Sequence, residues 1–300
     1  MKKIIIVFIL LVILSLTFYF RKPIMKLVVD KVIFRNGIVN NKANAYKLNY
    51  DFKYVKQTKD FYASNKQHLK DIIFTLLNDG NESFYFFCDY EECHNDLNEL
   101  SNSNEIVNIN NFLNPYNGYR KINMSINSLD KVTFNIIKTY DQESITAIEN
   151  KIDRIMSEII TDDMSTLNKI KAFHNYIINT TKYDKQYIES GLNDLNSSSH
   201  KATGPLFFNK ALCGGYSDTM SIFLNKLNIP NYRIASKNHI WNLVYLDNNW
   251  YHLDTTWDDP VTSDGSDIVL DTFFLISSKQ LEKVNTNYHA YDKNIYIEAN

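Results

Sequence analysis

The sequence has no excess of charge of either sign. It contains 32 basic and 34 acidic residues among 300, a formal net charge of -2. A nucleic-acid backbone is held by a basic patch or a basic excess, so this balance argues against a nucleic-acid partner. Glycine and proline are also scarce, with 8 and 5 residues, which we attribute to a bias of genome composition. The hydrophobic share of 44% is that of a globular chain with one large core or two modest ones.

Cysteine is rare as well, with Cys88, Cys93 and Cys213 as the only three. Outside the cytoplasm an even pair tends to oxidise, and the short spacing would let Cys88 pair with Cys93 and leave Cys213 as a free thiol. Two reduced thiols at 88 and 93 are an equally good interpretation. Cys88, Cys93 and His94 lack a fourth ligand at a zinc-site spacing, so we expect no metal, and no sequence feature indicates a cofactor.

One long hydrophobic run is present, at residues 4–20, with Lys2 and Lys3 before it and Arg21 and Lys22 after it. As a helix this run would be about 26 Å long, close to the ~30 Å of a bilayer core. It is longer than the ~7–15 residues of a signal-peptide core. We therefore expect an uncleaved signal anchor over residues 1–22 with an external domain behind it. A cleaved signal peptide is the alternative.

The rest of the chain divides by pattern into three parts. We expect a juxtamembrane linker over 23–59, a small α+β region over 60–140 without recognisable chemistry, and a catalytic domain over 141–300. The apolar spacing predicts helices at 69–77, 143–160 and 166–180, the last with Ser165 as its N-cap. It predicts strands at 83–88, 122–126, 132–137, 233–236, 239–246 and 250–254.

Cys213 precedes an amphipathic helix whose apolar residues run from Tyr216 to Leu227. At a helix N-terminus the macrodipole and the free backbone N–H groups stabilise a thiolate, and the same N–H groups can receive an oxyanion. Gly214 and Gly215 would keep side chains away from an approaching substrate carbonyl. Taken alone, Cys213 is explained as well by a buried cysteine that begins a core helix.

The following hairpin supplies two partners for this thiol. With a two-residue turn after Leu246, Trp241 faces Asp254, and His239 lies diagonally next to Asp254 on the same face. A turn of odd length would put His239 and Asp254 on opposite faces. A nucleophilic thiol needs a base, and the base needs a third group that orients it, so the sequence predicts the triad Cys213, His239 and Asp254.

Two other histidines are weaker candidates. His252 shares a strand face with Asp254, but it is only two residues away, where an orienting bond is awkward. His174 lies on a predicted helix and is interpreted as a structural residue. Trp241 is interpreted first as a core residue, although near Cys213 it would exclude water.

Three blocks, at 212–217, 238–242 and 250–260, resemble in order and spacing the Cys, His and Asp motifs of the bacterial transglutaminase-like superfamily of papain-like cysteine enzymes. The resemblance covers residues 163–260. It implies an α+β, papain-like core, with the cysteine at a helix N-terminus and the histidine and aspartate on an antiparallel sheet, and it implies thioester chemistry. Thr203 stands where the family often has an aromatic residue. This departure concerns either the oxyanion side of the active site or the access of substrate to it.

The expected function is therefore acyl-enzyme chemistry on amide or peptide bonds of envelope proteins or peptides. Transfer of the acyl group to an amine needs a dry channel that competes with ~55 M water, whereas the polar loop at 193–200 and the two glycines indicate an open site. This favours hydrolysis, with protein cross-linking and an inactive binding module as the alternatives. The residues expected around the substrate or the oxyanion are Gly214, Gly215, Tyr216, Thr203 and Trp241.

Overall fold

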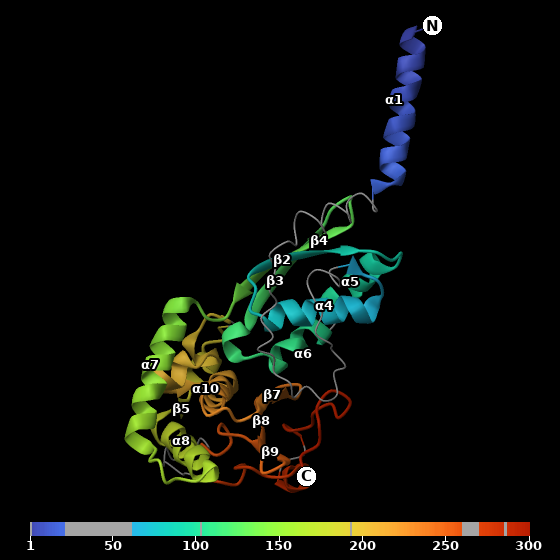
Figure 1. Cartoon of the computed structure of the whole chain (residues 1–300). Coiled ribbons are helices and arrows are strands. Elements are labelled where there is room, and N and C mark those ends of the chain that lie inside the picture. Colours follow the sequence, from blue (N-terminus) through green and yellow to red (C-terminus); the bar gives the residue numbers. More distant parts are fainter. Residues whose placement is uncertain (1, 22–61, 103, 193, 260–269, 285–286) are drawn as a thin grey trace. The chain divides into compact units, whose positions relative to one another are not determined.

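The computed structural model describes residues 2–21, 62–102, 104–192, 194–259, 270–284 and 287–300 (Figure 1). The linker expected over 23–59 lies outside these residues. The contacts divide the chain into two compact units. Among the described residues, the first unit is formed by 2–21, 62–102 and 123–135, and the second by 104–122 and by 136–300 with its gaps. Helices and sheets occur together, as expected for an α+β protein.

Helix α1 (Lys2–Tyr19) is formed by the N-terminal apolar run. Its side chains from Ile4 onward are exposed. Among the helices in the part of the chain that the structure describes, none has both the length and the apolar character to cross a bilayer. The signal anchor expected over residues 1–22 stays a prediction.

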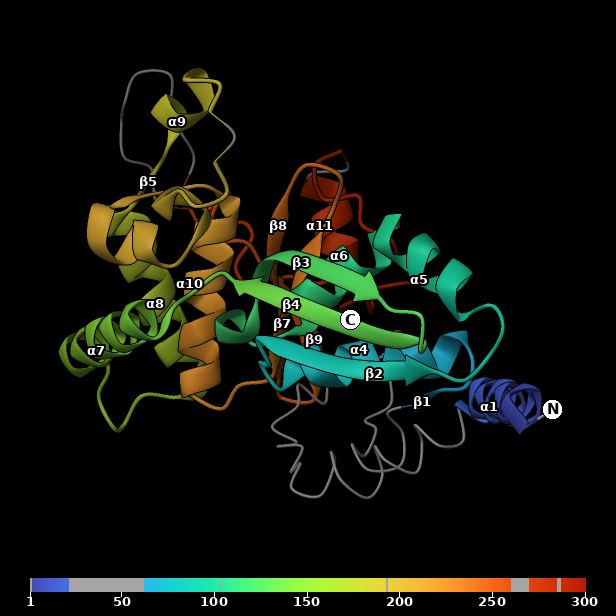
Figure 2. The ribbon, with the colours of Figure 1, turned by 90° about the horizontal axis from the view of Figure 1, so that it is seen from above.

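A four-stranded sheet in the order β1-β2-β4-β3 belongs mostly to the first unit, and Figure 2 shows β2, β4 and β3 side by side. The strands are β1 (Tyr62–Ala63), β2 (Ser83–Cys88), β3 (Tyr119–Ile126) and β4 (Lys131–Lys138). Phe84 of β2 stacks on Phe134 of β4 with the ring centroids 5.0 Å apart. Helices α4 (Lys66–Asn78) and α5 (Cys93–Asn102) belong to the same unit.

A disulfide joins Cys88, the last residue of β2, to Cys93, the first residue of α5. The sequence left this pairing open. Cys213 is consequently the only reduced cysteine of the chain. Any thiol chemistry is therefore confined to one residue.

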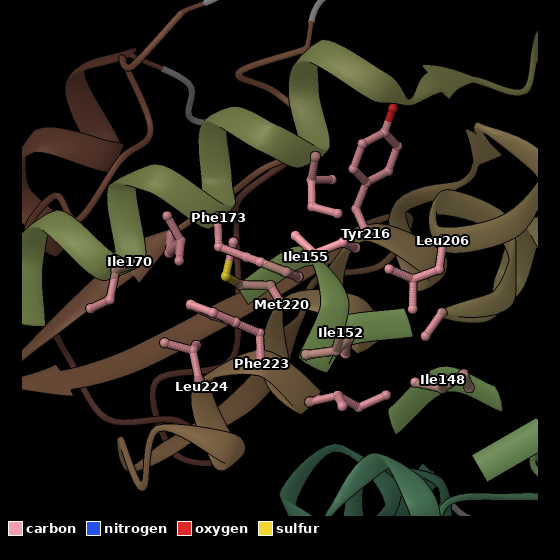
Figure 3. Packing of buried hydrophobic residues seen from close by; sticks show 14 of the residues in the cluster. Ile148, Ile152, Ile155, Ile170, Phe173, Leu206, Tyr216, Met220, Phe223 and Leu224 are labelled. Atoms are coloured by element: carbon pink, nitrogen blue, oxygen red, sulfur yellow. The ribbon is translucent and has the colours of Figure 1, made fainter. Parts of the chain in front are cut away.

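The second unit has a helical half built from α7 (Gln142–Ile159), α8 (Thr166–Thr180) and α10 (Cys213–Lys226). Ser165 caps α8 by accepting a hydrogen bond from the Asn168 backbone N–H, which confirms the predicted cap. The apolar faces of the three helices share one core (Figure 3). There the rings of Phe173 and Phe223 stack with centroids 3.9 Å apart. This stacking fixes α10, which begins with Cys213, against α8.

The other half of the second unit is an antiparallel sheet of β7 (Asn231–Ala235), β8 (Ile240–Leu246) and β9 (Asn249–Leu253), in that order. Leu246 pairs with Asn249, which confirms the predicted hairpin register. Asp247 and Asn248 both have positive φ, 49° and 66°. Positive φ at both central residues is typical of the two-residue type I′ turn, whose twist matches that of the strands.

Short elements complete the second unit. The helices are α6 (Asn104–Phe112), η2 (Pro115–Asn117), α9 (Lys185–Glu189), η3 (Ser198–His200), the π-helical η4 (Gly204–Phe208) and α11 (Ser278–Val284). Strands β5 (Lys182–Tyr183) and β6 (Lys210–Ala211) form a parallel pair.

The two units do not follow the division expected at residue 140. Residues 104–122 pack with the second unit, because the Asn111 side chain donates a hydrogen bond of 2.7 Å to the Tyr296 hydroxyl. The ring of Phe112 also stacks on Tyr296, with centroids 5.6 Å apart. Contacts between residues so far apart in the sequence cannot be inferred from local sequence patterns.

Candidate active site

Cys213 is the first residue of α10 and is half-buried. Leu212, which precedes it, provides no side-chain cap for the helix. The positive end of the helix dipole is therefore not used by a capping side chain, and it favours negative charge on the Cys213 sulfur.

Gly214 and Gly215 let the start of α10 lie directly against the backbone of residues 199–201. A Cβ atom on Gly215 would lie 2.7 Å from the Ser199 carbonyl oxygen and 2.9 Å from that of Lys201. A Cβ on Gly214 would lie 3.0 Å from the carbonyl oxygen of His200. The structure thus gives these glycines a packing role, whereas the sequence suggested that they clear a path for the substrate.

The hairpin brings His239 and Asp254 together as its register predicts. His239 directly precedes β8, and Asp254 directly follows β9. The His239 Nε2 atom lies 2.5 Å from Asp254 Oδ2, and both side chains are buried. Trp241 is stacked on the His239 ring, with centroids 5.5 Å apart and 14° between the ring planes. The imidazole is therefore held both by a hydrogen bond and by an aromatic face.

The charge state of this pair follows from its surroundings. Burial alone would lower the pKa of His239, but the Asp254 carboxylate and, to a smaller extent, the Cys213 side chain raise that pKa to about 10. Burial would raise the pKa of Asp254, yet hydrogen bonds and charge from His239 and His289 hold it well below its usual value. Because Nε2 of His239 is used by Asp254, Nδ1 is the ring nitrogen left for Cys213. At neutral pH the thiol thus meets an imidazolium, the partner that stabilises a thiolate.

Asn242 of β8 connects the histidine strand to the cysteine helix. Its side-chain N–H₂ group donates to the Ser217 carbonyl oxygen at 3.0 Å and to Ser221 Oγ at 3.1 Å, both on α10. All three residues are buried. These bonds fix the distance between the element that carries Cys213 and the strand that follows His239.

A second imidazole, which sequence reasoning missed, lies on the same carboxylate. His289 Nε2 is 2.7 Å from Asp254 Oδ2, the oxygen that also bonds His239. No local motif around His289 distinguishes it, so no sequence signal could have found it. The three groups place ligand atoms within 4.8 Å of one another. Atoms that share a zinc ion at about 2.0–2.1 Å lie roughly 3.3 Å apart, however, so the contacts of 2.5 and 2.7 Å fit hydrogen bonds better than metal ligation.

The two other histidines that the sequence raised have partners elsewhere. The indole N–H of Trp241 donates to His252 Nδ1 at 3.1 Å, and His252 Nε2 lies 2.9 Å from Ser278 Oγ. Burial, the largest effect, lowers the pKa of His252 to about 3, so its ring is neutral. His174 Nε2 lies 3.0 Å from Asp258 Oδ2, and both side chains are fully buried. These contacts support His239, and not His252, as the partner of Cys213.

A pocket of about 370 Å³ lies against His239. Besides His239 it is lined by the aromatic residues Tyr183, Trp257 and Tyr288 and by the polar residues Asn238, Thr256 and Asp259. Tyr216, expected near the substrate, is buried and donates its hydroxyl proton to Asp259 Oδ2 at 2.5 Å. Thr203 directly precedes η4 and is not among the lining residues.

Comparison with known proteins identifies a family for part of the chain. The family model described as the transglutaminase-like superfamily matches residues 153–255, which include all three members of the triad. No curated protein matches the chain. Among solved structures, the chain is similar to one described as "Crystal structure of a TGase", with 21% identity and a TM-score of 0.36, over 46% of this chain and 45% of that chain. The chain thus spans less than half the length of that structure. Residues 153–255 of this chain are a domain of the transglutaminase-like superfamily.

Proposed function

We propose that this protein is a cysteine enzyme that cleaves amide or peptide bonds through a thioester on Cys213. The observation that carries the proposal is the position of His239, which bonds Asp254 at 2.5 Å and has a pKa that the Cys213 side chain helps to raise. A nucleophile, a proton carrier and an orienting carboxylate in this order are the parts that acyl transfer requires.

The first half of the reaction uses the three residues as follows. The Cys213 thiolate attacks the carbonyl carbon, and the backbone N–H at the start of α10 receives the oxyanion. The C–N bond then breaks while the His239 imidazolium gives its proton to the leaving amine, which leaves a thioester and a neutral imidazole. Asp254 holds the ring in place during this proton transfer and stabilises its charged form.

The second half decides between hydrolysis and transfer. In hydrolysis, water gives a proton to His239 and attacks the thioester carbon, the C–S bond breaks, and a carboxylic acid and the thiolate are released. We favour hydrolysis because three of the pocket residues beside His239 are polar, Asn238, Thr256 and Asp259, and a transfer enzyme must keep water from the thioester. Cross-linking of proteins through an amine acceptor is the alternative.

The test is to give the purified chain a glutamine-containing protein and a labelled primary amine in excess. We expect release of free acid to outpace incorporation of the amine, since ammonia is released in both reactions. Faster amine incorporation would establish cross-linking instead. Cys213→Ala is the control and should abolish both reactions. If the wild-type protein performs neither reaction, and iodoacetamide does not label Cys213 at mildly acidic pH, the protein is a binding module.

We also propose an external location for the catalytic domain, behind an anchor formed by the apolar run at residues 4–20. Envelope proteins or peptides would then be the substrates. Protease added to intact cells should release the second unit. Protection in intact cells, with digestion only after lysis, would contradict this location.

A further inference from the structure

The carboxylate of Asp254 is shared by two imidazoles, of which the proposed triad uses one. His289 Nε2 bonds Asp254 Oδ2 at 2.7 Å, and His239 Nε2 bonds the same oxygen at 2.5 Å. The two imidazole rings are nearly perpendicular, with centroids 5.2 Å apart. All three side chains are buried. His289 therefore touches the orienting carboxylate nearly as closely as the proposed base does.

The other oxygen of Asp254 is also fully occupied. Oδ1 accepts the backbone N–H groups of Thr256 at 3.0 Å and Trp257 at 3.2 Å. A carboxylate offers about four acceptor positions, and here four donors fill them. Rotation of the carboxylate would break several bonds at once, so its orientation depends on each donor.

The hydrogen bonding of His289 indicates which nitrogen carries its proton. Its Nε2 faces a carboxylate and must donate. Its Nδ1 is buried and has no hydrogen-bond partner among the residues that the structure describes. A proton on Nδ1 would be a buried donor without an acceptor, which is unfavourable. His289 therefore acts on Asp254 as a hydrogen-bond donor through Nε2.

Aromatic neighbours keep the His289 ring from turning. The ring stacks on Phe273 with centroids 5.1 Å apart and meets Trp241 and Trp257 edge-on at 4.8 and 5.2 Å. The backbone before His289 is tied to the strand region as well, because Ser236 Oγ donates to the Tyr288 carbonyl oxygen. The donor is thus held at one fixed position.

We propose that His289 is a positioning residue of the active site, which locks the Asp254 carboxylate so that His239 stays aimed at Cys213. The proposal rests on the proposed function of the triad. It extends that function by a fourth residue, contributed by a segment beyond the three motifs.

The expected pH effect follows from the groups around Asp254. Although burial tends to raise the pKa of Asp254, its hydrogen bonds to His239 and His289 lower it. The other titratable groups around His239 and Asp254 are Cys213, Tyr183, His252, Asp258, Tyr288 and Tyr291. Without the donor of His289, Asp254 takes up a proton at a higher pH. The carboxylate then holds His239 less firmly beside Cys213, and the imidazolium stabilises the Cys213 thiolate less.

The test compares two variants of the full chain that separate the hydrogen bond from the packing. His289→Phe keeps an aromatic ring between Phe273, Trp241 and Trp257 but has no donor. His289→Gln loses the ring but keeps an N–H donor where Nε2 lies. The readout is the rate of Cys213 alkylation by iodoacetamide as a function of pH, which follows the thiolate and needs no substrate. Only Cys213 can react, because the other two cysteines form the disulfide.

We expect the acid limb of the alkylation profile to move up by about one pH unit in His289→Phe, which makes alkylation about tenfold slower at a given pH on that limb. His289→Gln should keep the wild-type limb. Phe273→Leu, which loosens the same aromatic contacts without removing a donor to Asp254, should also keep it. A wild-type profile in His289→Phe, or an equal shift in Phe273→Leu, would overturn the proposal.

A folding check and a second pair of variants accompany this test. Tryptophan fluorescence checks that each variant is folded. If His289→Gln does not fold, the comparison of His289→Phe with Phe273→Leu still separates hydrogen bonding from packing. A protein that releases no product in the amide assay but shows the expected alkylation shift would contradict the proposed reaction and leave the role of His289 standing.

Discussion

The close approach of α10 to residues 199–201 predicts that Gly215→Ala destabilises the protein, although alanine is the better helix former. The new Cβ would lie 2.7 Å from the Ser199 carbonyl oxygen, 2.9 Å from that of Lys201 and 3.1 Å from the Cβ of Ala211. Both oxygens belong to the backbone, so neither can rotate away. The start of the helix, and Cys213 with it, would have to move.

The size of the effect is the difference of two terms. In a helix interior alanine is favoured over glycine by about 1 kcal/mol. Overpacking of a close contact costs about 1–3 kcal/mol, and contacts this short with two backbone atoms belong at the upper end. We therefore expect a net loss of about 2 kcal/mol in the free energy of unfolding. For a unit of this size, that corresponds to a fall of about 4–8 °C in Tm.

Tryptophan fluorescence measures this loss in the second unit alone. The chain has three tryptophans, at 241, 250 and 257, and all of them belong to that unit. Gly214→Ala is the matched control, because its Cβ would meet one backbone oxygen at 3.0 Å and nothing else closer than 3.7 Å. We expect a smaller loss for it. A Gly215→Ala protein as stable as the wild type, or less affected than Gly214→Ala, would refute the packing argument.

Three further outcomes are expected. Asp254→Asn should lower kcat by about 10⁴-fold in the amide-release assay, because an amide cannot orient and charge His239 as a carboxylate does; a kcat near wild type would exclude Asp254 as the orienting group. The pKa of His252 is lowered from 6.5 to about 3, so the unfolded chain binds a proton in this window that the folded chain does not. Stability should therefore fall as the pH drops below about 6.5, and His252→Gln should flatten that slope in thermal melts at several pH values; an unchanged slope would contradict this origin. Denatured, unreduced protein should react with one equivalent of a thiol reagent and reduced protein with three, and three equivalents before reduction would contradict the disulfide.

Much of the site could be predicted from the sequence because it depends on local rules. The two-residue turn fixes the strand register, and the register puts His239 and Asp254 on one face, where the structure finds them 2.5 Å apart. The start of α10 at Cys213 follows from the helical spacing of apolar residues after it. These inferences need only the helical spacing of the apolar residues and the length of one hairpin turn.

The rest of the site depends on contacts between distant parts of the chain. His289 is 35 residues from Asp254 and reaches it because its segment packs among rings from other elements. The packing role of Gly215 depends on residues 199–201, which no pattern places beside it. The position of Phe112 in the second unit likewise depends on Tyr296. Such contacts are set by the packing of the whole unit, which a single sequence does not display.

The type I′ turn at Asp247 and Asn248 has a consequence for how this domain can evolve. Surface turns are where chains usually accept insertions and deletions. This turn is seven residues from Asp254, roughly 20 Å along a strand, and it lies outside the pocket lining. Yet one inserted residue would shift the pairing and carry Asp254 to the opposite face of the sheet. The length of the turn is therefore under the same selection as the triad, and relatives that lengthen it by one residue should be those that have lost the chemistry.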